Sequence, residues 1–221
     1  FSIGDIPVDW SAKTIWVGTG EVNSSRSSYS GTGVYKSKDN GKNWQYLGLP
    51  ESHHIGKIIL HPTNATIAWV AVLGHLYSPN KERGVFKTSD GGKTWKHSLF
   101  VDENTGAVEM DINPKNPNEI YAAMWYRERR AWDWKESGKT SAVYKSNDGG
   151  DTWKPVTLSG SGFATGDKIG RIGVAVFPKN PNIVYAVVDN NNLKPDTAKK
   201  KLDTTKYQLE DFKNTTKENF A

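Results

Sequence analysis

Cysteine is absent from the 221 residues, and methionine occurs only twice. Without cysteine the chain has no disulfide scaffold, no thiolate zinc site and no cysteine nucleophile. No apolar run reaches the roughly 20 residues that a membrane helix needs, so we expect no membrane span. The net charge of +5 is small and is dispersed apart from Lys199–Lys201. A nucleic-acid-binding protein usually has a more concentrated basic surface, so we expect no nucleic-acid partner.

Glycine and aromatic residues are abundant instead, with 21 Gly, 9 Trp and 9 Tyr. This composition favours short strands and tight turns over helices. The chain begins with Phe1, and no charged segment followed by an apolar segment marks a signal peptide there. We therefore interpret the sequence as a mature or excised segment.

One phrase that ends in tryptophan occurs three times, at Ser37–Trp44, Thr88–Trp95 and Ser146–Trp153. Each copy contains an Asp and, two residues later, a Gly. An Asp at this place accepts backbone N–H bonds and the Gly adopts a positive φ, so the phrase predicts a tight turn. The Trp is expected to pack between sheets. We predict a structural role for Asp39, Gly41, Trp44, Asp90, Gly92, Trp95, Asp148, Gly150 and Trp153.

A second phrase, strand–turn–strand, recurs around Trp10, Pro62, Pro114 and Pro178. Together the two phrases give four antiparallel strands in about 50 residues, which is the period of a propeller blade. We therefore predict an all-β fold, a β-propeller fragment of about three and a half four-stranded blades. The predicted blades are 2–47, 55–99 and 106–157, with a half blade at 170–189.

The repeated turn resembles the Asp-box proteins, or bacterial neuraminidase repeats, whose pattern is Ser/Thr-x-Asp-x-Gly-x-Thr-Trp/Phe. Only Asn43 departs from that pattern at the Thr position. The segments Gly18–Asn23, Ala71–Leu76 and Ala122–Trp125 are more narrowly similar to sortilin-type propellers, including bacterial sortilin-like proteins of the cell envelope. The resemblance covers residues 2–190 and implies a partial propeller domain at 1–189. Rings of this family have more blades, so the remaining blades are expected from the same longer chain or from a partner chain.

Residues 190–221 change character, because apolar residues thin out and Lys199–Lys201 interrupts them. We interpret this segment as a polar linker or insertion with short helices, in which Thr215–Glu218 is a capping box. The alternative is a docking segment anchored by Leu209 and Phe212.

Loops at the propeller end opposite the Asp turns are expected to carry function. The segment Trp125–Trp134 combines three Trp, one Tyr and three Arg within ten residues, and such residues lead at binding hot spots. The alternative is that the Trp side chains pack the loop and the Arg side chains are solvated. The candidate binding residues are Glu21, Arg26, His75, Arg83, Trp125, Arg127, Arg129, Arg130, Trp132 and Trp134.

No metal site and no cofactor are expected. His53 and His54 are neighbours in the sequence, and an extended chain directs successive side chains to opposite faces. The pair is therefore poorly placed to bind one ion together.

The resemblance implies a non-catalytic binding propeller of the cell envelope or exterior, whose partner is a protein or peptide, or else a glycan. A secretion-associated scaffold would leave the same signature. The alternative is a glycoside hydrolase of the sialidase or xyloglucanase type. The Arg-Ile-Pro phrase of sialidases is absent, since Gly170–Gly173 lacks the Pro. Other glycosidases need two facing carboxyl groups, and no spacing selects a pair among Glu21, Glu51, Asp102 and Asp133, although a partner carboxylate can lie outside this segment.

Overall fold

The computed structural model describes residues 2–25 and 28–192. The chain divides into two compact units, Phe1–Asn191 and Asn192–Ala221, and every strand given below lies in the first unit. The predictions for the polar tail, including Leu209, Phe212 and Thr215–Glu218, lie outside the described residues, as does Arg26.

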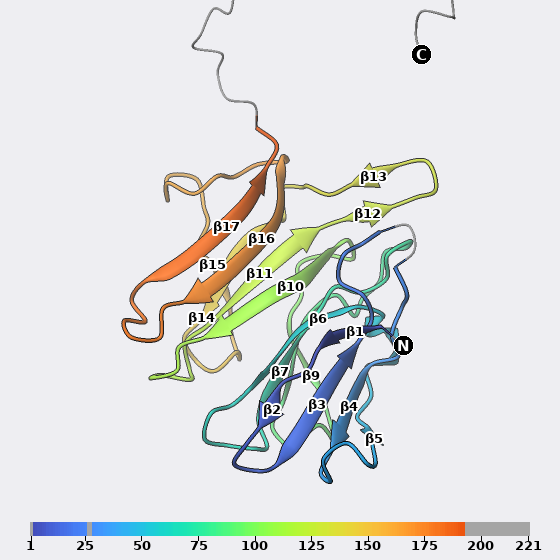
Figure 1. Ribbon diagram of the computed structural model, residues 1–221. Helices are drawn as coiled ribbons and strands as arrows, with labels where there is room; N and C mark the ends of the chain where they lie inside the picture. The colour runs from blue at the N-terminus through green and yellow to red at the C-terminus, as the bar shows by residue number, and fades with distance from the viewer. Residues whose placement is uncertain (1, 26–27, 193–221) are drawn as a thin grey trace, which may run out of the picture. The chain divides into compact units, whose positions relative to one another are not determined.

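Three antiparallel sheets follow one another along the chain, each with a path of four strands, and the first has β2 as an additional fifth strand (Figure 1). The first sheet runs in the order β1 (Ile3–Asp5), β3 (Thr14–Thr19), β4 (Val34–Ser37) and β5 (Gln45–Tyr46), with β2 (Val8–Asp9) also paired to β3. The second consists of β6 (Ile55–Leu60), β7 (Ala68–Val72), β8 (Gly84–Thr88) and β9 (Lys96–Leu99). The third consists of β10 (Thr105–Ile112), β11 (Ile120–Tyr126), β14 (Ala142–Ser146) and β15 (Lys154–Pro155).

The remaining strands form two two-stranded sheets. The fourth sheet pairs β16 (Ile169–Val176) with β17 (Val184–Asn190), and a separate hairpin pairs β12 (Glu128–Arg129) with β13 (Trp134–Lys135). Among the described residues, the helical element is the short 3-10 turn η1 (Pro50–Ser52). Within the described part of the chain, no helix has the length and apolar character needed to cross a bilayer.

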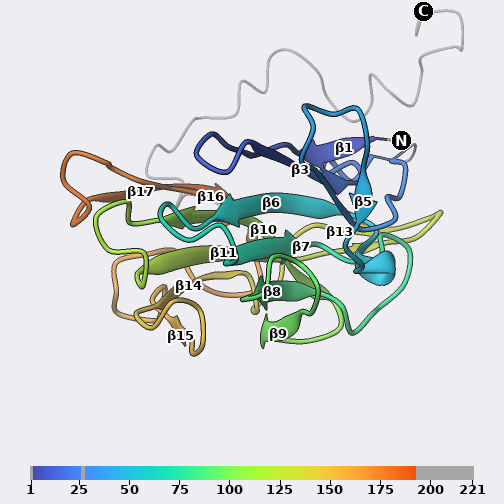
Figure 2. The same ribbon diagram turned by 90° about the horizontal axis from the view of Figure 1, so that it is seen from below.

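Consecutive sheets pack through their first strands, because β6 contacts β1 and β10, and β10 contacts β16. Figure 2 shows the strands of the second sheet, β6 to β9, side by side and in sequence order. The prediction of an all-β, partial β-propeller with three four-stranded blades and a two-stranded fourth sheet is confirmed.

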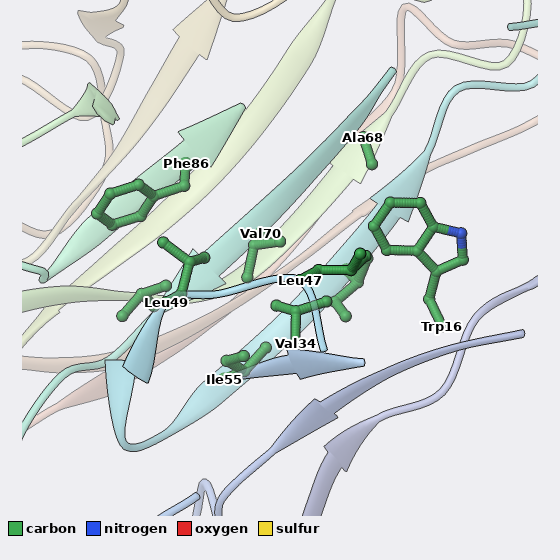
Figure 3. Close-up of a cluster of buried hydrophobic side chains, with 10 residues drawn as sticks. Trp16, Val34, Leu47, Leu49, Ile55, Ala68, Val70 and Phe86 are labelled. Atoms are coloured by element: carbon green, nitrogen blue, oxygen red, sulfur yellow. The ribbon is translucent and has the colours of Figure 1, made fainter. Parts of the chain in front are cut away.

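The strands β7 and β11, each the second strand of its sheet, consist mainly of apolar and aromatic residues, and nearly all of them are buried because both faces of the strand are covered. In β7, Ala68, Val70 and Val72 pack in the cluster shared with the first sheet (Figure 3). The alternate residues Trp69 and Ala71 pack in the next cluster, together with residues of β10 and β11. The period of two in a strand thus divides one apolar run between two interfaces.

The first strands approach each other closely at glycine positions. A Cβ on Gly4 would lie 1.9 Å from the carbonyl oxygen of Ile55, and one on Gly56 would lie 2.4 Å from that of Val108. Only a residue without a side chain permits this approach. Carboxylates add a second link, since Asp5 Oδ2 accepts a hydrogen bond of 2.7 Å from the Ile58 amide.

The three repeated turns share one hydrogen-bond pattern, as the second copy illustrates. Thr88 Oγ1 donates to Asp90 Oδ1 at 2.8 Å and accepts from the Gly92 amide at 2.9 Å. Asp90 Oδ1 also accepts from the Thr94 amide at 3.0 Å, and Gly92 has a φ of 93°. These hydrogen bonds lower the pKa of the Asp90 carboxyl, with the side-chain bond from Thr94 the largest cause.

The tryptophans that close the turns differ in their surroundings. Trp95 donates from Nε1 to the Leu47 carbonyl at 2.7 Å and packs against the first core cluster. Trp153 donates to Ser98 Oγ at 2.8 Å and packs against the second cluster. Each therefore reaches the sheet before its own, whereas Trp44 in the first sheet is 44% exposed.

Candidate functional site

The sheets have two ends. The end that carries the repeated Asp turns is called the turn end. The loops β3–β4, β7–β8 and β11–β14 emerge at the opposite end, called the loop end, as do the connections from one sheet to the next. In antiparallel sheets these connections must alternate in this way.

Arg83 joins three of the segments at the loop end. Its Nη1 donates to the carbonyl of Asn104 at 2.7 Å and to that of Arg127 at 3.3 Å, and its Nη2 donates to the carbonyl of His75 at 2.5 Å. The side chain is buried, and burial lowers the pKa of this guanidinium to about 10. The guanidinium therefore holds the backbone of these segments in place.

Arg127 extends the same network to the first sheet. Its Nη1 donates to Ser24 Oγ, and its Nη2 donates to the Gly74 carbonyl at 3.1 Å. The residue is fully buried, and burial, followed by the charges of Arg83 and Arg171, lowers its pKa. One buried guanidinium thus connects the loops β3–β4, β7–β8 and β11–β14.

Trp125 is also buried. Its Nε1 donates to the Glu136 carbonyl at 2.7 Å, which ties β11 to the loop that follows β13. Arg83, Trp125 and Arg127 are therefore placed inside the loop end, although the sequence suggested them as contact residues. Burial gives Trp125 and Arg127 a supporting position, while Arg83 also lines the cavity described below.

The hairpin β12–β13 projects past the end of β11 (Figure 1). Arg129 lies over the ring of Trp134, with its guanidinium carbon 4.1 Å from the ring centroid. Trp132, in the connection between the two strands, is 82% exposed. The hairpin therefore presents a cation–π pair and a free tryptophan face at one place.

The carboxylate of Glu128 organises the base of this hairpin. It accepts a hydrogen bond from Tyr126 Oη. It also forms an ion pair with Arg130, in which Nη2 lies 3.2 Å from Glu128 Oε2. The Tyr126 hydrogen bond is the main cause that lowers the pKa of Glu128, while burial raises the pKa of Tyr126 to about 12. Glu128 thus stays ionised and Tyr126 stays protonated around neutral pH.

A cavity of about 160 Å³ opens between the hairpin and the β7–β8 loop. Its walls combine apolar side chains with arginines, namely Leu76, Tyr77, Pro79, Arg83, Arg129 and Arg130, together with Ser78, Asn104 and Glu128. Small-molecule sites are usually about 300–1,000 Å³, so this cavity has the size of a pocket for a single side chain.

A second group of side chains lies where η1 meets the β7–β8 loop. Glu51 Oε2 lies 3.1 Å from His75 Nε2 and 3.9 Å from His53 Nε2. The two imidazole rings stack, with centroids 3.7 Å apart. Burial, followed by the charge of His75, lowers the pKa of His53.

His54 does not join this group. It is buried, and burial lowers its pKa to about 3, so it is neutral around pH 7. In the sequence, His53 stands next to His54. In the structure, its ring stacks on that of His75, which is 22 positions further on. No local spacing signals that pairing, because it depends on how two loops converge.

The remaining candidate is Glu21, which lies in the β3–β4 loop and is half-buried. Its amide donates to the Tyr29 carbonyl at 3.1 Å. Of the predicted residues, Arg83, Arg129 and Arg130 line one cavity, and Arg129 stacks on Trp134.

Comparison with solved structures finds propellers. An ancestral GH74 enzyme matches with a TM-score of 0.62 and 20% identity over 84% of this chain and 21% of its own. The GH74 enzyme of Niastella koreensis matches with a TM-score of 0.58 and 20% identity over 87% of this chain and 30% of its own. The GH74 xyloglucanase from Xanthomonas campestris matches with a TM-score of 0.54 and 13% identity over 82% of this chain and 26% of its own. At these identities the likeness shows the fold alone.

Sequence comparison is more specific. A curated relative, the vacuolar protein sorting/targeting protein 10 of Kluyveromyces lactis, is 31% identical over 86 residues. The match covers 36% of this chain and 5% of that relative, so the chain spans a small part of the protein it matches. A family model described as Sortilin, neurotensin receptor 3 (Sortilin-Vps10) matches residues 32–221. Because that match covers more than half of the sequence, the chain belongs to the Sortilin-Vps10 family.

Proposed function

We propose that the loop end of this propeller is a non-catalytic binding surface for a protein or peptide. The observation that carries the proposal is the hairpin β12–β13, which exposes Trp132 and, through Arg129 and Arg130, lines a pocket of side-chain size. Tryptophan and arginine lead at binding hot spots because they combine a large contact area with polar groups. The pocket offers apolar walls together with Arg129 and Arg130, which suits a peptide with apolar and acidic side chains.

The buried arginines support this proposal. An exposed hairpin contributes most to affinity when it is held rigid before the ligand arrives. Arg83 and Arg127 fix the carbonyls of Asn104 and Gly74, on the segments that flank the hairpin. The name of the Kluyveromyces lactis relative, a protein sorting and targeting protein, agrees with a protein ligand. We extend the proposal to an extracellular or cell-envelope location.

Further blades are part of the same proposal. In β17, Tyr185 and Val187 are exposed, Val187 to 78%, although the matching strands β7 and β11 are buried. Exposed apolar strands of this kind favour coverage by another sheet. The remaining blades of the ring, from the same longer chain or a partner chain, would supply that cover.

The test is selection of binding peptides from a random displayed library on the full-length protein, followed by affinity measurement with single variants. Trp132→Ala is expected to weaken binding about tenfold or more. The matched control is Trp10→Ala, because Trp10 is 84% exposed but lies in the β2–β3 turn at the turn end. Equal losses in both variants, or no loss in Trp132→Ala, would contradict the proposal.

The second candidate function is glycoside hydrolysis, because the GH74 enzymes share the fold of this chain. A hydrolase needs an acid with a raised pKa and a facing carboxylate. Burial raises the pKa of Glu109 on β10, whose Oε1 lies 4.0 Å from Lys57 Nζ. Hydrolysis of xyloglucan or aryl glycosides that is lost in Glu109→Gln, Glu51→Gln or Asp133→Asn would replace the binding proposal with this one. A glycan array separates sugar binding from peptide binding in the same experiment.

A further inference from the structure

Glu51, His53 and His75 form a group with the composition of a metal site. One ligand atom from each lies within 4.8 Å of the others. The Nε2 atoms of both histidines face the same carboxylate oxygen, at 3.1 Å and 3.9 Å. The three atoms are close enough for one ion at the usual metal–ligand distances of about 2.0–2.4 Å, provided that the stacked rings of His53 and His75 turn so that both Nε2 lone pairs are directed at the ion.

The two loops that contribute these residues are fastened to each other. Asn80 Nδ2 donates to the Glu51 carbonyl at 2.9 Å, and the His75 amide donates to Asn80 Oδ1 at 3.3 Å. Arg83 also holds the His75 carbonyl. The convergence of Glu51 with His75 is therefore maintained by backbone contacts and does not depend on an ion.

The backbone at His53 is held in an unusual conformation. Its φ is 48° and its ψ is −46°, which a residue with a side chain rarely adopts. The His53 carbonyl accepts a hydrogen bond of 2.5 Å from the Gly31 amide, and a Cβ on Gly20 would lie 1.9 Å from that carbonyl. The β3–β4 loop thus fixes the backbone of His53 and the direction of its Cα–Cβ bond.

The surroundings of the histidines also suit an ion. A metal-binding imidazole usually hydrogen-bonds through its other nitrogen, which orients the ring. His75 Nδ1 makes such a contact with Ser78 Oγ at 3.0 Å.

We propose that Glu51, His53 and His75 bind one divalent first-row transition-metal ion, with zinc as the representative. Two imidazole nitrogens and one carboxylate oxygen favour such ions over magnesium or calcium, which prefer oxygen ligands alone. Glu51 is exposed, so the coordination positions that remain open face solvent. None of the three proposed ligands lies in the hairpin β12–β13 or lines its pocket, although Ser78, which orients His75, is one of the pocket residues.

The test is calorimetric titration of the full-length protein, without a polyhistidine tag, with zinc chloride and in parallel with magnesium chloride. The expected result is one zinc ion per chain and no magnesium binding. His75→Gln, His53→Gln and Glu51→Gln are each expected to weaken zinc binding by about 100-fold or more, and Ser78→Ala by about tenfold, as for groups that orient a ligand. Circular dichroism verifies that each variant is folded.

The matched control is His61→Gln. His61 lies in the β6–β7 connection at the turn end and is not part of the group. It is expected to leave zinc affinity unchanged. A cobalt titration gives an independent readout, because the visible absorption of bound cobalt reports nitrogen and oxygen ligands. Absence of zinc binding, or zinc binding that persists in Glu51→Gln and His75→Gln, would overturn the proposal and leave a hydrogen-bonded cluster.

Discussion

The turn end carries one turn in three copies, whereas the loop end carries loops that share no sequence phrase. At the turn end, Asp39, Asp90 and Asp148 accept equivalent bonds from the residues that follow them. At the loop end, the carbonyls of several loops converge on two buried guanidiniums, Arg83 and Arg127. A local turn is determined by adjacent residues, but a convergence of loops depends on the whole arrangement. This difference separates a repeated scaffold from the region that is free to acquire a function.

The largest expected effect is at the centre of the loop end. Arg127→Ala removes a fully buried side chain and leaves its partners at Ser24 and Gly74 without a donor. We expect a loss of about 3–4 kcal/mol in the free energy of unfolding, from the cavity and the unsatisfied groups together. Denaturant unfolding measures it. Arg130→Ala, an exposed arginine on the hairpin, is the control and should stay within about 0.5 kcal/mol of the wild type. Equal losses would mean that Arg127 does not hold the loops.

The next effect compares two copies of the same turn. Trp95→Ala removes a ring that packs on the preceding sheet and donates to Leu47, so we expect a loss of about 2–3 kcal/mol in the free energy of unfolding. Trp44→Ala, at the equivalent position of the first sheet, should cost about 1 kcal/mol or less because Trp44 is 44% exposed and is not part of the first core cluster. Thermal unfolding of both variants measures the difference. If Trp44→Ala costs as much as Trp95→Ala, packing on a preceding sheet is not the cause.

Lowering the pH should reduce the free energy of unfolding, because it protonates the Asp carboxylates of the repeated turns. The pKa of Asp90 is lowered from its ordinary value of 3.8 by hydrogen bonds. The carboxylate therefore stabilises the fold above about pH 4, and this contribution is lost as the pH falls below that value toward the folded-state pKa. Asp90→Asn should reduce the drop in unfolding midpoint between about pH 5 and about pH 2.5. Asp133→Asn, at the tip of the hairpin, is the control that keeps the wild-type drop. An unchanged pH dependence in Asp90→Asn would contradict this role.

The sequence predicted the turn end more fully than the loop end. The Asp, Gly and Trp of each turn act over a few residues, so spacing alone identified the turn, and the repeat predicted the propeller. At the loop end the sequence singled out Arg83 and Arg129 alike, although one is buried and the other stacks on Trp134. Residue type gives no information about which arginine the surrounding backbone will enclose.

The contact of His75 with Glu51 was beyond the sequence for a related reason. Their loops belong to different connections and meet where Asn80 of the β7–β8 loop donates to the Glu51 carbonyl. Adjacent histidines were visible in the sequence, yet His54 is directed into the core and its ring centroid lies 6.4 Å from that of His53. Long-range convergence of this kind requires coordinates.

The smallest effect on stability is expected at the proposed contact surface itself. Trp132→Ala should change the free energy of unfolding by no more than about 0.5 kcal/mol, because the ring is mostly in solvent. Denaturant unfolding measures it. A larger loss would mean that Trp132 packs the hairpin and is not free for a ligand.

Hydrogen exchange of the full-length protein, with and without a selected peptide ligand, tests the central claim most directly. The account predicts that the peptide slows exchange in the hairpin residues 128–135 and in the loop 74–83, and leaves the turns 39–44, 90–95 and 148–153 unchanged. Protection that is confined to those turns, with none in the hairpin, would contradict the assignment of binding to the loop end.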